Sequence, residues 1–130
     1  MFDNLEILRM SQGLAKHAGT RQELIARNVA NADTPGYRAQ DVASFSETYR
    51  SSSDSAALRV TRPGHVDASA PGPAQARPVD APGSSAPNGN TVSIETEMVK
   101  ATGVRQDFDM ALAIYKSSLD ILRSAIGRGR

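Results

Sequence analysis

The sequence predicts an all-α protein in which two long terminal helices form a coiled-coil-like pair or bundle, joined by a largely disordered middle rich in Pro, Gly, Ala and Ser. Three observations support this fold class: an apolar stripe at helical spacing near the N-terminus, a heptad repeat near the C-terminus, and between them a segment with very few large apolar side chains. The 130 residues are 39% hydrophobic and 5% aromatic, which gives a compact domain little core. Both helices therefore need helical partners.

The first predicted region, residues 1–34, is a helix that ends in a corner. Asp3 can act as N-cap with Glu6 three residues later, and Phe2 and Ile7 have the spacing of a hydrophobic staple. The helix is expected to run for about 29 residues, or roughly 43 Å. Its apolar stripe comprises Ile7, Leu14, Ala18, Ile25, Val29 and Ala32. This stripe needs a partner helix, because the chain offers no other core.

A corner motif follows, defined here as Asn28, Asn31, Thr34, Pro35, Gly36 and Tyr37. Pro35 and Gly36 supply the two central positions of a type II turn. Two interpretations of Asn28 and Asn31, one helical turn apart, stay open. They terminate the helix, as Asn commonly does, or they face a neighbouring helix and fix its register.

The middle of the chain is predicted in two parts. Residues 35–62 form the turn and a partly ordered segment in which a short helix is one interpretation. Residues 63–92 form a flexible Pro/Gly-rich linker, since 63–90 contains six of the 7 prolines and four of the 10 glycines. With Val79 the only aliphatic residue larger than alanine between Asp67 and Thr91, burial cannot offset the ordering entropy of about 1–2 kcal/mol per residue.

The last region, residues 93–130, is a heptad helix that begins near Ser93 and spans about 33 residues. Its predicted seam, the helix interface, consists of Ile94, Met98, Ala101, Phe108, Leu112, Tyr115, Leu119, Leu122 and Ile126. Arg105 breaks the repeat. Gly103 marks either a close helix crossing or a bend. Glu95 and Glu97 lie two apart and are expected on a solvated face.

Residue types that carry chemistry are sparse. Cysteine is absent, and His17 and His65 have no ligand partners at metal-binding spacing, so no catalytic, metal or cofactor site is predicted. The net charge of +1 excludes the strongly basic class of nucleic-acid-binding proteins. The N-terminus has acidic residues where a signal peptide carries positive charge, and no stretch of about 20 apolar residues predicts membrane insertion.

Residues 28–37, N-V-A-N-A-D-T-P-G-Y, resemble the N-terminal signature of the flagellar rod, hook and hook-associated axial proteins, N-[IVL]-A-N-x-x-T-P-G-[YF]. Within that family, the short chain and two internal segments resemble the proximal rod proteins. These segments are LRVTRPGHV at 58–66 and NGNTVSIETEM at 88–98. The stretch 67–86 departs from the family in being richer in Ala, Pro and Gly.

The resemblance implies a structural rod subunit of the flagellar basal body that self-assembles through its terminal helices into a shaft transmitting torque for motility. Its implied partners are copies of itself, other rod subunits, and basal-body ring and export-gate proteins. Its implied location is the periplasmic rod, reached from the cytoplasm by type III export without a cleaved signal peptide. A soluble coiled-coil adaptor or export chaperone is the alternative, and it predicts a discrete dimer. A cell-wall enzyme would need a convergent acid pair that the sequence does not show.

Overall fold

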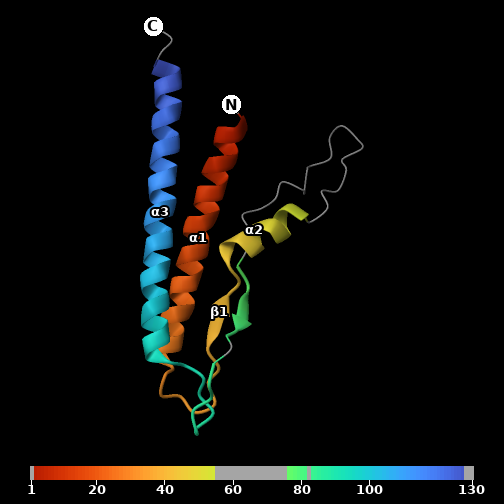
Figure 1. Ribbon diagram of the computed structural model, residues 1–130, viewed down its shortest axis with the longest axis vertical. Helices are drawn as coiled ribbons and strands as arrows, with labels where there is room; N and C mark the ends of the chain where they lie inside the picture. Colours follow the sequence, from red (N-terminus) through yellow and green to blue (C-terminus); the bar gives the residue numbers. More distant parts are fainter. Residues whose placement is uncertain (1, 55–75, 82, 128–130) are drawn as a thin grey trace.

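The computed structural model describes residues 2–54, 76–81 and 83–127. In chain order the elements are α1 (Phe2–Ala30), β1 (Gln40–Val42), α2 (Phe45–Asp54), β2 (Pro78–Asp80) and α3 (Ile94–Gly127). Helices α1 and α3 run antiparallel, with both chain ends at the same end of the pair, and the small sheet and α2 lie beside α1 (Figure 1). The predicted class, two long terminal helices packed together, is confirmed, and the sheet is an addition.

The two long helices match their predicted lengths. Helix α1 has 29 residues and begins at Phe2, one residue before the expected cap Asp3. Helix α3 has 34 residues, and Ser93 caps it: its Oγ accepts a hydrogen bond from the Thr96 amide at 3.4 Å. The helix continues without interruption through Gly103, where an added Cβ would meet nothing within 4 Å. The predicted close helix crossing at Gly103 is therefore wrong for this pair.

The contact between α1 and α3 is made mostly by small side chains. Its core contains Ala18 and Ile25 of α1 and Val104 of α3, with Ala101 packed against them. The residues that α3 buries are seven apart: Glu97, Val104, Ala111 and Ser118. Positions 98, 105, 112 and 119 of the expected repeat each follow one of these by one residue. The contact with α1 therefore uses a stripe rotated by one position from the predicted seam.

Strands β1 and β2 form a two-stranded antiparallel sheet in which Asp41 is opposite Val79. Part of the predicted linker 63–92 is thus a strand, and residues 63–75 and 82 lie outside the described residues. Hydrogen bonds explain the difference, because the backbone of this segment pairs with residues 36–42 instead of burying apolar side chains. An example is the Ala81 amide, which donates to the Ala39 carbonyl at 2.9 Å.

Helix α2 confirms the short helix suggested between residues 37 and 49, but shifts it to Phe45–Asp54. It lies against α1 through His17, which is buried. The His17 Nε2 atom is 2.8 Å from the Ala43 carbonyl oxygen, and its ring meets the Phe45 ring edge-on at a centroid distance of 5.7 Å. His17 therefore belongs to an interface within the chain.

Candidate functional site

The corner motif forms the turn that its sequence predicts. The Tyr37 amide donates to the Thr34 carbonyl at 3.2 Å, and Gly36 has φ +72°. A positive φ at the third residue of a turn that begins Thr-Pro is the type II geometry, which favours glycine at that position. The predicted type II turn is confirmed.

Asn90 closes the corner from a distant part of the chain. Its side chain is buried, and Nδ2 lies within hydrogen-bonding distance of three carbonyl oxygens in the corner that follows α1. These belong to Asn31 at 2.9 Å, Ala32 at 2.7 Å and Thr34 at 2.9 Å. These carbonyls follow Ala30, the last residue of α1, and belong to the turns of the corner. Asn90 therefore caps the corner from the segment of the same chain that precedes α3.

The turn that carries Asn90 packs directly on the corner. The Gly36 amide donates to the Asn88 carbonyl at 3.0 Å, and the Thr91 amide donates to the Tyr37 carbonyl at 3.1 Å. Gly89 has φ +80°, and a Cβ there would lie 3.4 Å from the Gly36 Cα. Both glycines are thus needed for their backbone conformation where two turns meet.

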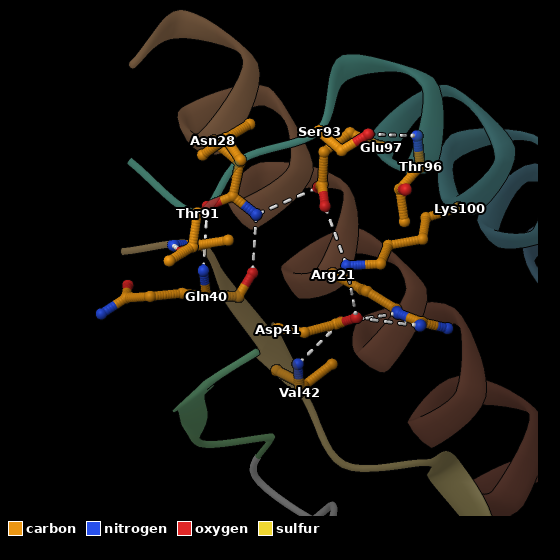
Figure 2. Close-up of polar contacts among 12 residues, drawn as sticks. Arg21, Asn28, Gln40, Asp41, Val42, Thr91, Ser93, Thr96, Glu97 and Lys100 are labelled. Atoms are coloured by element: carbon orange, nitrogen blue, oxygen red, sulfur yellow. Dashed lines mark hydrogen bonds and ion pairs between the residues drawn. The ribbon is translucent and has the colours of Figure 1, made fainter. Parts of the chain in front are cut away.

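Asn28 joins α1, β1 and α3 and is fully buried, with 0% exposure. Its Nδ2 donates to the Gln40 carbonyl at 2.7 Å and to Glu97 Oε2 at 3.0 Å. Its Oδ1 accepts from the Gln40 amide at 3.0 Å and from the Tyr37 hydroxyl at 3.3 Å. Figure 2 shows this amide between the strand and α3. All hydrogen-bonding capacity of the side chain is used.

The chain of contacts continues through charged groups. Lys100 Nζ lies 2.8 Å from Glu97 Oε1 and 3.2 Å from Asp41 Oδ2. Arg21 donates two hydrogen bonds to the same Asp41 as a bidentate ion pair, from Nε to Oδ1 at 2.8 Å and from Nη2 to Oδ2 at 3.1 Å (Figure 2). We call Arg21, Asn28, Asp41, Glu97 and Lys100 the polar network. Its two acids and two bases balance in charge.

The pKa values of three members of the polar network, Arg21, Asp41 and Lys100, are shifted toward their charged forms. Burial opposes the ionisation of Asp41, but hydrogen bonds from Arg21 and from the Val42 amide hold the pKa of Asp41 below its ordinary value. Burial likewise opposes the charge of Lys100, and its hydrogen bonds to Glu97 and Asp41 outweigh this and raise its pKa. The hydrogen bond to Asp41 raises the pKa of Arg21. The network is therefore a set of ion pairs that join β1 to both helices.

The two asparagines of the corner motif have different surroundings. Asn28 faces α3, whereas Asn31 Nδ2 donates to the Arg27 carbonyl of its own helix at 2.8 Å and Oδ1 accepts from the Thr34 hydroxyl at 3.3 Å. Thr34, Pro35 and Gly36 are exposed, and Tyr37 is half-buried. A role of these residues in register between subunits stays a prediction.

Sequence reasoning missed most of the polar network. Glu97 was expected on a solvated face, and this is wrong because its side chain is 2% exposed and pairs with Asn28. Arg21, Asp41 and Lys100 stand in no recognisable motif. For Asn90 the sequence did contain a usable signal, because Pro87-Asn88-Gly89 is a turn sequence and a turn places the residue after it at a defined position.

The predicted seam of α3 is largely uncovered within the chain. Exposure reaches 65% at Met98 and 76% at Ile126. Ile94, Phe108, Leu112 and Tyr115 are also exposed, while Ala101, Leu119 and Leu122 are half-buried. Phe108 and Arg105 border a groove of about 650 Å³ between the helices, floored by Ala18, Gly19, Ala101 and Val104. A role of the seam between subunits stays a prediction.

A second exposed apolar face lies on another side of α3. It is formed by Val99, Met110 and Ile121, which are 73%, 54% and 55% exposed. These positions are eleven residues apart, three helical turns, so they share one face. Helix α3 therefore exposes large apolar side chains on two sides besides the one that meets α1, with Gln106 and Ser117 between those of the second side. Within the described residues, no helix is long and apolar enough to cross a membrane, and no three His, Cys, Asp or Glu residues are grouped as metal ligands.

Known proteins match this chain in the region of the corner motif and over most of its length. Residues 11–38, which cover most of α1 and the corner, match the family described as flagella basal body rod protein. Flagellar basal body rod protein FlgB of Salmonella typhimurium is 31% identical over 99% of both chains. The protein of the same name from Escherichia coli K12 is 32% identical over 95% of this chain and 99% of its own, and that from Agrobacterium fabrum is 28% identical over 87% of each. The chain belongs to the flagellar basal body rod protein family.

Proposed function

We propose that this protein is a structural subunit of the flagellar basal-body rod that assembles with copies of itself and with other rod subunits through α1 and α3. One observation carries the proposal: α3 has two exposed apolar faces besides the face that α1 covers. An apolar helix that faces water on two sides is typical of a helix that becomes buried in a larger assembly. The relatives named as rod proteins support the same conclusion.

The number of uncovered faces favours a polymer over a closed dimer. A symmetric dimer buries the same patch on both copies, so contact through the Leu112 side would leave the Ile121 side in water. Contacts that join different faces of successive copies form either a closed ring or an open helical array, and the relatives named as rod proteins favour the array. The adaptor or chaperone alternative needs one face only.

The corner and the polar network suit a part that transmits torque. Ion pairs and capping hydrogen bonds join α1, α3 and the sheet at one end of the helix pair, so these elements turn together under load. We infer that the corner motif also contributes to subunit register. Asn31→Ala is then expected to impair rod assembly while export continues. Normal rods and motility with this variant would contradict the register role.

Export, location and further partners follow from the same assignment. The subunit is proposed to leave the cytoplasm through the flagellar type III apparatus without a cleaved signal and to join the periplasmic rod, next to ring and export-gate proteins. An uncovered helix pair supports this route. Monomers that gain most of their apolar burial on assembly are easy to unfold beforehand.

Assembly through both faces can be tested with single charges. Leu112→Glu and Ile121→Glu each place a carboxylate on one exposed face, and Thr102→Glu, in the exposed polar row of α3 that also carries Asp109 and Lys116, is the matched control. Sedimentation across concentration and swimming in soft agar are the measurements. Loss of large species and motility with both variants, but not the control, is expected. Loss with only one variant, together with a fixed small oligomer in the unchanged chain, would favour the adaptor.

A further inference from the structure

We infer that Glu97, paired with Asn28, sets the sliding register of α1 against α3 within one chain, and that the apolar contact does not. The contact surface repeats every seven residues. Ser11, Ala18 and Ile25 line α1, and Val104, Ala111 and Ser118 line α3. A slip of one heptad moves Ala111 into the place of Val104 opposite Ala18. Small residues then still meet small residues, so packing alone discriminates weakly between the two registers.

The covalent chain does not by itself prevent such a slip, because Asn28 and Glu97 are 69 positions apart and a connection of that length imposes little restriction on how two helices slide. The hydrogen bonds of Asn88 and Thr91 to the corner also hold the start of α3 near the end of α1, so they compete with the Asn28–Glu97 pair as the source of register. Register must therefore come from contacts that cannot be made in the slipped position.

The pairing of Asn28 with Glu97 is such a contact. Both side chains are at most 2% exposed, and among the described residues every buried side-chain nitrogen or oxygen has a partner. A slip would place the Asn28 amide opposite Ala101 or Val104 and remove Glu97 from its donor. Buried polar groups without partners are costly, which is how a single buried amide selects one register in coiled coils. Glu97 is thus a positioning residue.

A double substitution removes the α3 half of the polar network and leaves the α1 half intact. Glu97→Met with Lys100→Met deletes one negative and one positive charge, while Asn28 keeps Gln40 and Arg21 keeps Asp41. Glu97→Gln with Lys100→Met is the conservative partner, since the Gln oxygen still accepts from Asn28. Glu95→Met with Lys116→Met makes the same charge change at exposed sites of α3 and serves as the control.

Engineered cysteine pairs report the register, because the chain contains no cysteine of its own. Ala18→Cys with Val104→Cys reports the observed register, in which Val104 packs between Ala18 and Ile25. Ile25→Cys with Ala111→Cys reports the slipped one, because only a slip of one heptad brings Ala111 next to Ile25. Each pair is introduced into the full-length chain and oxidised in dilute solution. Intrachain disulfides are quantified by peptide mass mapping, and helicity is measured in parallel by circular dichroism.

The unchanged network is expected to crosslink through the first pair only. With Glu97→Met/Lys100→Met, the ratio of observed to slipped crosslink is expected to fall by roughly tenfold or more, the effect of one unpaired buried polar group. The Gln variant and the exposed control should keep the original ratio. Crosslinking only in the observed register by the Met variant would overturn the inference and assign register to the Asn90 cap. If the Met variant loses helicity, the comparison is repeated with Glu97→Ala/Lys100→Ala, because alanine is the better helix former at both sites. Loss of helicity in this variant as well would show that Glu97 and Lys100 only stabilise the fold, and it would overturn the inference.

Discussion

Asn90→Ala is expected to be among the most destabilising single substitutions in the protein. The Asn90 side chain shares its two amide hydrogens among three carbonyls of the corner that follows α1, and its Oδ1 accepts from the Val92 amide at 2.7 Å. A net contribution of about 1 kcal/mol for each of these hydrogen bonds, reduced because the Asn31 and Thr34 carbonyls still accept from the Thr34 and Tyr37 amides, gives a loss of about 2–4 kcal/mol. This is a large part of the roughly 5–15 kcal/mol that small domains possess.

Urea unfolding followed by circular dichroism measures this loss. With a dependence of about 2 kcal/mol per molar urea, the midpoint should fall by about 1–2 M. Asn88→Ala is the matched control, because the exposed Asn88 side chain accepts one hydrogen bond, from the Asn90 amide at 3.1 Å. It should cost no more than about 1 kcal/mol. Equal midpoints for the two variants would refute the capping role of Asn90.

Three further results are expected. The pKa of Asp41 lies below its ordinary value of 3.8, so its stabilising effect is present above the unfolded-state pKa and is lost as pH falls through the folded-state pKa; Asp41→Asn should flatten stability against pH in that acid window, and an unchanged slope would exclude Asp41 as its source. Gly36→Ala should cost about 1–2 kcal/mol in thermal unfolding, because φ is +72° there. Gly103→Ala, in mid-helix with open space around it, should instead stabilise α3 by about 1 kcal/mol, and destabilisation of the monomer would show an undetected close contact.

The sequence predicted the long helices and the corner because both depend on local signals. Helical spacing defined α1 and α3, Ser93 marked the start of α3, and Pro35-Gly36 defined the turn. The polar network depends instead on which residues meet in three dimensions. Glu97 has the same local pattern as Glu95, and only the position of Asn28 across the pair distinguishes the buried carboxylate from the exposed one.

The row of α3 that meets α1 differs by one position from the predicted seam for a related reason. The apolar stripe of α3 is wider than one partner needs, so a 4,3 repeat can be drawn along either of two adjacent rows. Leucine, isoleucine and methionine mark the row that stays exposed, and the small residues Ala111 and Ser118 mark the row that meets α1. A search for large apolar residues therefore finds the uncovered row first.

The separation of Asn28 and Glu97 by 69 positions also has a consequence for when the protein folds. During synthesis, α1 leaves the ribosome long before the residues that cover it exist, and closing so long a loop costs about 4 kcal/mol in chain entropy. Contacts between residues far apart in sequence also slow the folding step itself. The newly made chain is consequently expected to pass through an interval in which its N-terminal third has been synthesised but α3 has not. During that interval, the apolar stripe of α1 is uncovered and can be bound by a factor that recognises unfolded subunits.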